Sequence, residues 1–303
     1  MKISFKIIVF MISAAAIVYG FTTKSDVQTP PVNEGFIELA YSDGSPSTYG
    51  VRAINEVLSA VGVRVSTLSL PESAAHLFKA SQRRALTSDE AKELISAFSL
   101  DRQGLLAEIQ LAGRAPAAYH GGSLSTSEIG VSPYPKVYDM KSLSPEMTVY
   151  LQEKFGKLHV NSSEDGVGID EVMTIVSGGP YTWFFVLPGN VVGKLTFGHV
   201  GKSGHAWRVS YPGLVPHGGF FDAEYGLVVA YAHGPDHFVM RYKNPGIQGA
   251  ETLGKNPWID FSKKSPHLLT NSHGLTWSID TQTQPTTKIE RIQLLAGDFH
   301  IKR

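Results

Sequence analysis

Residues 172–211 read VMTIVSGGPYTWFFVLPGNVVGKLTFGHVGKSGHAWRVSY, and this stretch decides the fold. Short apolar runs alternate in it with breaks rich in Gly and Pro. Evenly spaced short strands of this kind are typical of an antiparallel sandwich or barrel. The same alternation of apolar runs with breaks rich in Gly and Pro continues toward the C-terminus. The expected strands are Val172–Ser177, Tyr181–Leu187, Val191–His199, His205–Tyr211, Gly226–His233, Asp236–Tyr242, Leu275–Ile279 and Ile289–Leu295.

The preceding part of the chain has a different pattern. A strand at Gly35–Ser42, a helix at Thr48–Gly62 and a strand at Val63–Leu70 suggest a β-α-β opening. Helical spacing then predicts helices at Pro71–Ser81, from Thr87 onward, at Asp101–Leu111 and, after a loop-like stretch, at Glu146–Phe155. The predicted fold class is therefore α+β. A β-α-β and helical N-terminal region, residues 34–145, precedes an antiparallel β-barrel domain, residues 146–303.

The first residues have the pattern of an export signal. Lys2 and Lys6 precede an uncharged apolar run at 7–21, which is short for a bilayer span. We predict a signal peptide at residues 1–21 and a linker at 22–33. The mature protein would be periplasmic or extracellular, with no stable membrane span; an uncleaved N-terminal anchor is the alternative. An exported chain with 0 Cys fits a bacterial periplasm or exterior.

Composition narrows the function classes. Lys+Arg and Asp+Glu are 27 each, so the formal net charge is 0 and a nucleic-acid partner is not expected. Hydrophobic residues are 42% and charged residues 18%, which is enough apolar material for a large core. The expected partner is a small-molecule ligand or substrate, and a homodimer is left open.

Histidines concentrate in the β-rich part. The chain has 11 His, and five of them fall within residues 199–237. Alternation along each strand puts His199, His205 and His233 on its more apolar face. A hairpin turning at 200–204 would set His199 opposite His205. These rings are therefore expected to converge in one apolar interior.

Converging imidazoles are suited to a metal centre or to acid–base chemistry. The predicted metal ligands are His199, His205 and His217, for a divalent transition metal such as Zn, Fe, Mn or Ni. Glu224 is a fourth ligand or a base. Two readings without a metal stay open: a pocket in which His and Tyr move protons, and hydrogen-bonded core histidines.

The remaining candidate residues lie on the same strands. The predicted catalytic residues are Glu224, Tyr231 and His233. The predicted substrate contacts are Trp207, Arg208 and Tyr211, although Arg208 lies on the opposite face of its strand from the other two.

The histidine-rich segment 198–233 resembles a cupin-type double-stranded β-helix. The resemblance rests on Gly198–His205, Pro212-Gly213, Pro216-His217-Gly218, Glu224 and Gly226–His233. It implies a small jelly-roll barrel that holds a metal through His and Glu, but the usual first motif of two His separated by one residue is absent here. Residues 207–231 are also similar to hydroxylaminobenzoate lyase-like proteins, through the PG turn, the His and the GLVVAY strand.

Other sequence motifs would indicate different kinds of site. Residues 161–166 begin like a calcium loop, but Val172 occupies the position that needs a bidentate Glu. A looser calcium site with Asp165, Asp170 and Glu171 competes with a simple acidic turn. The chain has no HExxH, GxSxG or Walker A motif.

The resulting hypothesis is an exported enzyme acting on a small polar organic molecule inside a cupin-like barrel, a metal-dependent lyase, isomerase or oxygenase. The alternatives are a non-catalytic periplasmic binding or sensory protein and a structural or assembly protein.

Overall fold

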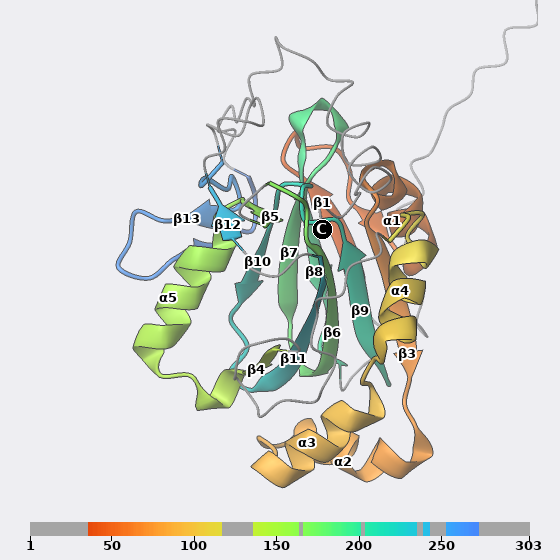
Figure 1. Cartoon of the computed structure of the whole chain (residues 1–303). Helices are drawn as coiled ribbons and strands as arrows, with labels where there is room; N and C mark the ends of the chain where they lie inside the picture. The colour runs from red at the N-terminus through yellow and green to blue at the C-terminus, as the bar shows by residue number, and fades with distance from the viewer. Residues whose placement is uncertain are drawn as a thin grey trace, which may run out of the picture.

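The computed structural model describes residues 36–116, 136–163, 166–200, 204–234, 239–242 and 253–272 (Figure 1). Two antiparallel sheets form the centre, and helices flank them. The helices are α1 (Val51–Leu58), α2 (Ala75–Ser81), α3 (Ser88–Ala97), α4 (Arg102–Leu111) and α5 (Pro145–Gly156). In the described ranges no helix is long and apolar enough to cross a bilayer.

The first sheet has the strand order β10-β7-β8-β1-β2, and every pairing in it is antiparallel. Its strands are β1 (Ile37–Tyr41), β2 (Thr48–Tyr49), β7 (Tyr181–Val186), β8 (Val192–Phe197) and β10 (His217–Phe221). The earliest strand of the chain, β1, therefore lies beside a strand more than 150 residues later.

The second sheet has the order β3-β9-β6-β11-β4 and is also antiparallel throughout. Its strands are β3 (Arg64–Ser69), β4 (Lys136–Asp139), β6 (Asp170–Gly178), β9 (His205–Tyr211) and β11 (Gly226–His233). Two short pairs complete the strands: β5 (Val160–Ser162) with β12 (Val239–Arg241), and β13 (Ile259–Asp260) with β14 (His267–Leu268). Among the described pairings none joins the two five-stranded sheets into a closed barrel.

The two sheets face each other across the main core. Alternate residues of each strand point into it, as the period of two requires. Burying each such large apolar side chain stabilises the fold by about 1.5–3 kcal/mol. The core includes Leu39, Trp183, Phe185, Leu195 and Phe197 from the first sheet, and Ile175, Trp207, Val209, Tyr211 and Val228 from the second.

A helical layer covers the outer face of the second sheet. Leu94 of α3 and Leu105 of α4 belong to one buried cluster with Val172, Val229 and Tyr231 of the sheet. A capping box starts α3: Thr87 Oγ1 accepts from the Glu90 amide at 3.3 Å, and the Glu90 carboxylate accepts from the Thr87 amide at 2.9 Å. Figure 1 shows α2 and α3 at one end of the molecule and α4 along its side.

Helix α5 and the C-terminal strands lie on the other side of the molecule. Ser144 caps α5 by accepting from the Met147 amide at 3.2 Å, and Pro145 occupies its first turn. The helix end packs closely on β10, where a Cβ on Gly218 would meet the Phe155 carbonyl oxygen at 3.0 Å. The outer face of the first sheet is covered by Trp258, whose indole N–H donates to the Val192 carbonyl at 2.9 Å.

The predicted helices are confirmed, with ends shifted by a few residues. The strands predicted from 172 to 211 and at Gly226–His233 are confirmed too. Of the predicted strand Asp236–Tyr242, residues 239–241 form β12, and 236–238 lie outside the described residues. The predicted signal peptide and linker, and the strands at Leu275–Ile279 and Ile289–Leu295, also lie outside them.

Two predicted connections are wrong. Strands β8 and β9 belong to different sheets, so no hairpin sets His199 opposite His205. Strands β1 and β3 also belong to different sheets and do not form a β-α-β unit. Both errors have one cause, because local composition marks a turn without showing which strand the chain pairs with next.

Candidate functional site

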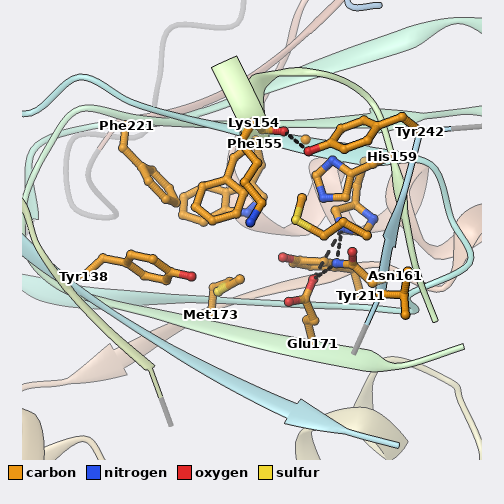
Figure 2. Close-up of a pocket in the computed structure, with 16 residues that line it drawn as sticks. Tyr138, Lys154, Phe155, His159, Asn161, Glu171, Met173, Tyr211, Phe221 and Tyr242 are labelled. Atoms are coloured by element: carbon orange, nitrogen blue, oxygen red, sulfur yellow. Dashed lines mark hydrogen bonds and ion pairs between the residues drawn. The ribbon is translucent and has the colours of Figure 1, made fainter. Parts of the chain in front are cut away.

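A cavity of about 430 Å³ lies between the inner faces of the two sheets (Figure 2). Helix α5 and the β5–β12 pair contribute its remaining walls. The residues lining it are Tyr138, Lys154, Phe155, His159, Asn161, Glu171, Met173, Trp183, Tyr211, His217, Gly218, Gly219, Phe221, Val239, Met240 and Tyr242. A space of this size suits a small organic molecule.

One end of the cavity is aromatic. The Phe155 ring lies 5.7 Å from Tyr138 and 6.1 Å from Phe221, and Trp183 lies 5.4 Å from Phe221, all measured between ring centroids. Edge-to-face contacts of this kind hold the rings in place. This end is therefore a preformed apolar surface, on the left in Figure 2.

The other end carries a buried polar cluster. The Asn161 side-chain nitrogen lies 2.6 Å from Glu171 Oε2 and 2.9 Å from His217 Nε2. Glu171 Oε2 lies 3.3 Å from His217 Nε2. These three residues are at most 4% exposed. Three segments supply them: Asn161 is on β5, Glu171 on β6 and His217 at the start of β10.

Backbone carbonyls fix which ring nitrogen carries a hydrogen in both histidines of the cavity. His217 Nδ1 lies 2.7 Å from the Val215 carbonyl, and His159 Nδ1 lies 2.7 Å from the Lys157 carbonyl. A carbonyl only accepts, so each Nδ1 carries the hydrogen and donates it. In the neutral rings Nε2 then holds a lone pair, and that of His217 accepts the Asn161 N–H.

The Asn161 amide has one unsatisfied atom. Among the described residues its Oδ1 is buried without a hydrogen-bond partner, while its nitrogen donates to both Glu171 and His217. A flipped amide would put Oδ1 against the Glu171 carboxylate, where two acceptors repel, so the observed orientation is the favourable one. A buried unpaired acceptor costs about 1–3 kcal/mol.

His159 is held neutral. Burial, followed by the neighbouring His217 ring at 4.6 Å between centroids, lowers the pKa of His159 well below 6.5. The His159 ring therefore faces the cavity as an acceptor rather than as a cation at neutral pH.

Acid should destabilise the protein through His159. Below about pH 6.5 the unfolded chain protonates this imidazole while the folded protein leaves it neutral, so the unfolded state binds more protons. Unfolding free energy therefore falls as the pH drops from 7.5 toward the lowered pKa, by up to about 1.4 kcal/mol per pH unit. Guanidinium unfolding between pH 5.5 and 7.5 should show a flatter slope for His159→Gln than for wild type. The exposed His76→Gln is the control, and equal slopes for wild type and His159→Gln would contradict the prediction.

Two tyrosines in the cavity stay protonated. Burial first, and then the Glu171 carboxylate, raises the pKa of Tyr138 above its ordinary value of 10.0. Burial, with Tyr150 and Glu153 adding to it, raises the pKa of Tyr242 to about 12. The Tyr242 hydroxyl donates to the Lys154 carbonyl at 2.6 Å and so ties the β12 end to α5.

The predicted metal centre does not match these residues. Within the described ranges no group of three or more His, Asp or Glu side chains is placed to hold a metal ion. His217 does reach the cavity, but His199 and His205 are absent from its lining. The Asn161 N–H group, which is not a ligand, lies between the His217 nitrogen and the Glu171 oxygen. The cluster thus fits hydrogen-bonded acid–base groups better than a metal ion.

The predicted substrate contacts separate into two groups. Tyr211 lines the cavity with its ring centroid 4.7 Å from His217. Trp207 lies in the main core, between Phe197 at 5.6 Å and His205 at 4.5 Å. Arg208 points to the opposite face, where it donates to Glu108, Thr174 and the Phe98 carbonyl.

The residues predicted as catalytic lie away from the cavity lining. Tyr231 packs in the helical layer, where its hydroxyl accepts from the Leu100 amide at 3.1 Å. His233 pairs in register with Asp170, which shares that outer face, so the interior placement predicted for His233 is wrong. Val228 and Ala230 belong to the core between the sheets, whereas Leu227, Val229 and Tyr231 pack under the helical layer, so the face of this strand expected inside is the outer one. Glu224 is exposed between β10 and β11.

Sequence reasoning missed most of the site. One feature of the sequence could have indicated Glu171. Side chains alternate along a strand, so Glu171 shares a face with the apolar Met173 and Ile175, and its carboxylate should therefore point inside. For His159, Asn161 and Lys154 no local signal exists, since a short strand and a helix end carry them.

Comparisons with known proteins found matches among solved structures only. No family model matches the chain, and no curated protein matches it. Four chains of solved structures match. One is "Acireductone dioxygenase from Bacillus anthracis with cadmium ion in active center", 16% identical, with a TM-score of 0.45, covering 68% of this chain and 98% of that one.

Proposed function

We propose that the protein is an enzyme that moves a proton on a small amphipathic organic molecule bound between its sheets. One observation carries the proposal: a buried His–Asn–Glu cluster at the polar end of an otherwise aromatic cavity. The apolar body of the substrate packs against the aromatic end. Its reacting group lies at the cluster.

His217 is the base in this proposal. In the free protein its Nε2 lone pair accepts the Asn161 N–H at 2.9 Å; that hydrogen bond breaks as Nε2 takes the proton from a substrate O–H or an activated C–H. The resulting imidazolium keeps its Nδ1–H on the Val215 carbonyl. Its new Nε2–H faces Glu171 Oε2 at 3.3 Å, so the carboxylate stabilises the cation that forms.

The same proton then returns to the substrate. Delivery to a different carbon or oxygen makes the reaction an isomerisation, and delivery to a departing group makes it a lyase reaction. Neither needs an oxidant or another reactant. The Asn161 side chain, which lines the cavity beside His217, orients the reacting group there.

Export is part of the proposal as well. The signal-like pattern of residues 1–21 supports a location in the periplasm or outside the cell. Mass spectrometry of the N-terminus of protein recovered from a periplasmic fraction tests this.

Proton exchange tests the proposed function without knowledge of the natural substrate. Purified protein is incubated in D₂O with a panel of small aryl and alkyl ketones, oxo acids and β-hydroxy carbonyl compounds, and ¹H NMR follows deuterium incorporation. Wild type should accelerate exchange for members that bind, and Glu171→Gln should exchange more slowly. Panel members that bind without any exchange would favour a non-catalytic binding protein instead.

A further inference from the structure

Lys154 is the only Lys or Arg among the described residues that line the cavity. Figure 2 shows its side chain directed from α5 into the cavity beside Phe155. Its ammonium lies 5.9 Å from the Phe155 ring centroid and 5.6 Å from that of the exposed Tyr150. The charge therefore sits at the rim, between the aromatic surface and solvent.

This ammonium has no carboxylate partner among the described residues. The neighbouring acid on the same helix, Glu153, is already engaged by Lys157 at 2.6 Å. Glu171, the acid in the cavity, lies with Asn161 and His217. The effect of Lys154 on His159, whose pKa it helps to lower, shows that its field reaches the polar end.

We infer that the molecule bound in the cavity is an amphipathic monocarboxylate, whose carboxylate pairs with Lys154. The inference rests on the proposed function, because it names the substrate class of that site. With the carboxylate at the rim, the apolar body lies along Phe155 and Tyr138. The reacting hydroxyl or carbonyl then reaches Asn161 and His217.

The charges of the cavity also limit the ligand to one negative charge. Lys154 neutralises a single carboxylate, and a second anionic group deeper in the cavity would face Glu171. Like charges at close range in a partly buried site are strongly unfavourable. Phosphomonoesters and dicarboxylates are therefore poor ligands, and a cationic ligand would be repelled at the rim.

Isothermal titration of a matched ligand pair tests the inference. The pair is naphthalene-2-acetate and naphthalene-2-acetamide, which share shape and differ by one charge. Wild type should bind the acid about tenfold more tightly than the amide, since hydrogen bonds to charged groups contribute about 1.5–3 kcal/mol. Lys154→Met should abolish that preference by weakening acid binding, with amide binding unchanged. Lys157→Met removes an equal charge one helical turn away from the lining and should keep the preference.

Any other pattern overturns the inference. It fails if wild type binds neither compound or prefers the amide. It also fails if the acid preference survives in Lys154→Met or is lost to the same extent in Lys157→Met. Circular dichroism melting of each variant establishes that it folds, and Lys154→Arg, which keeps the charge, should retain the preference. The two proposals fail separately. Absence of exchange with the acid preference intact refutes only the enzyme, whereas exchange without an acid preference refutes only the monocarboxylate.

Discussion

An Arg208→Met variant is expected to lose about 3 kcal/mol of unfolding free energy. The guanidinium is 5% exposed and donates at 3.0 Å to Glu108, Thr174 and the Phe98 carbonyl. Methionine keeps much of the volume but leaves these acceptors facing an apolar chain. Breaking a buried pair by removing one partner costs about 3–5 kcal/mol. We place the loss at the lower end because Arg64 remains 3.5 Å from Glu108.

Urea unfolding followed by tryptophan fluorescence measures this loss. The matched control is Arg52→Met, whose pair with Glu56 is exposed on both sides and should change stability by less than about 1 kcal/mol. An Arg208→Met, Glu108→Leu double variant should recover part of the loss, since no carboxylate is then left buried. Similar stabilities for Arg208→Met and Arg52→Met would show that the buried network contributes little.

The second large effect is catalytic. His217→Gln should lower the rate of proton exchange by about 10²- to 10⁴-fold, the usual contribution of a positioned general base. Glutamine still fills the site and can bond to Asn161, but it cannot take the proton. The effect should fall on turnover rather than on ligand affinity, because the aromatic walls and Lys154 are untouched.

Exchange rates at saturating ligand, with affinity measured separately by titration, distinguish these two effects. The control is His267→Gln, an exposed histidine on β14 far from the cavity lining. If the His217→Gln protein exchanges protons at the wild-type rate, then His217 is not the base. His159→Gln should then be examined, because that ring is the other imidazole in the cavity.

Much of the fold could be predicted from local pattern. Helix starts such as Thr87 to Glu90 carry their own capping signal, and strands such as Tyr181–Val186 are apolar, short and bounded by Gly or Pro. Strand β10 was missed because it contains Gly218-Gly219, which indicates a turn. In the structure, the absence of a side chain at Gly218 instead allows the end of α5 to approach the sheet.

The candidate site could not be predicted in the same way. Asn161, Glu171 and His217 meet only because β5, β6 and β10 are brought together by pairings that no local sequence feature specifies. The histidine count was a misleading signal, since only one residue of the expected metal set reaches the cavity. Charge and burial of single residues, as for Glu171, indicate an interior position but not the neighbours found there.

The alternation of β6 links the two sides of the second sheet. Glu171 points into the cavity, whereas Asp170, one residue earlier, points outward and pairs with Arg114 at 3.3 Å near the end of α4. Substitutions at Arg114 would therefore shift the backbone that aims the Glu171 carboxylate. Selection on turnover should thus reach side chains that never meet the substrate, and the outer helices are less free to drift in sequence than their distance from the cavity suggests.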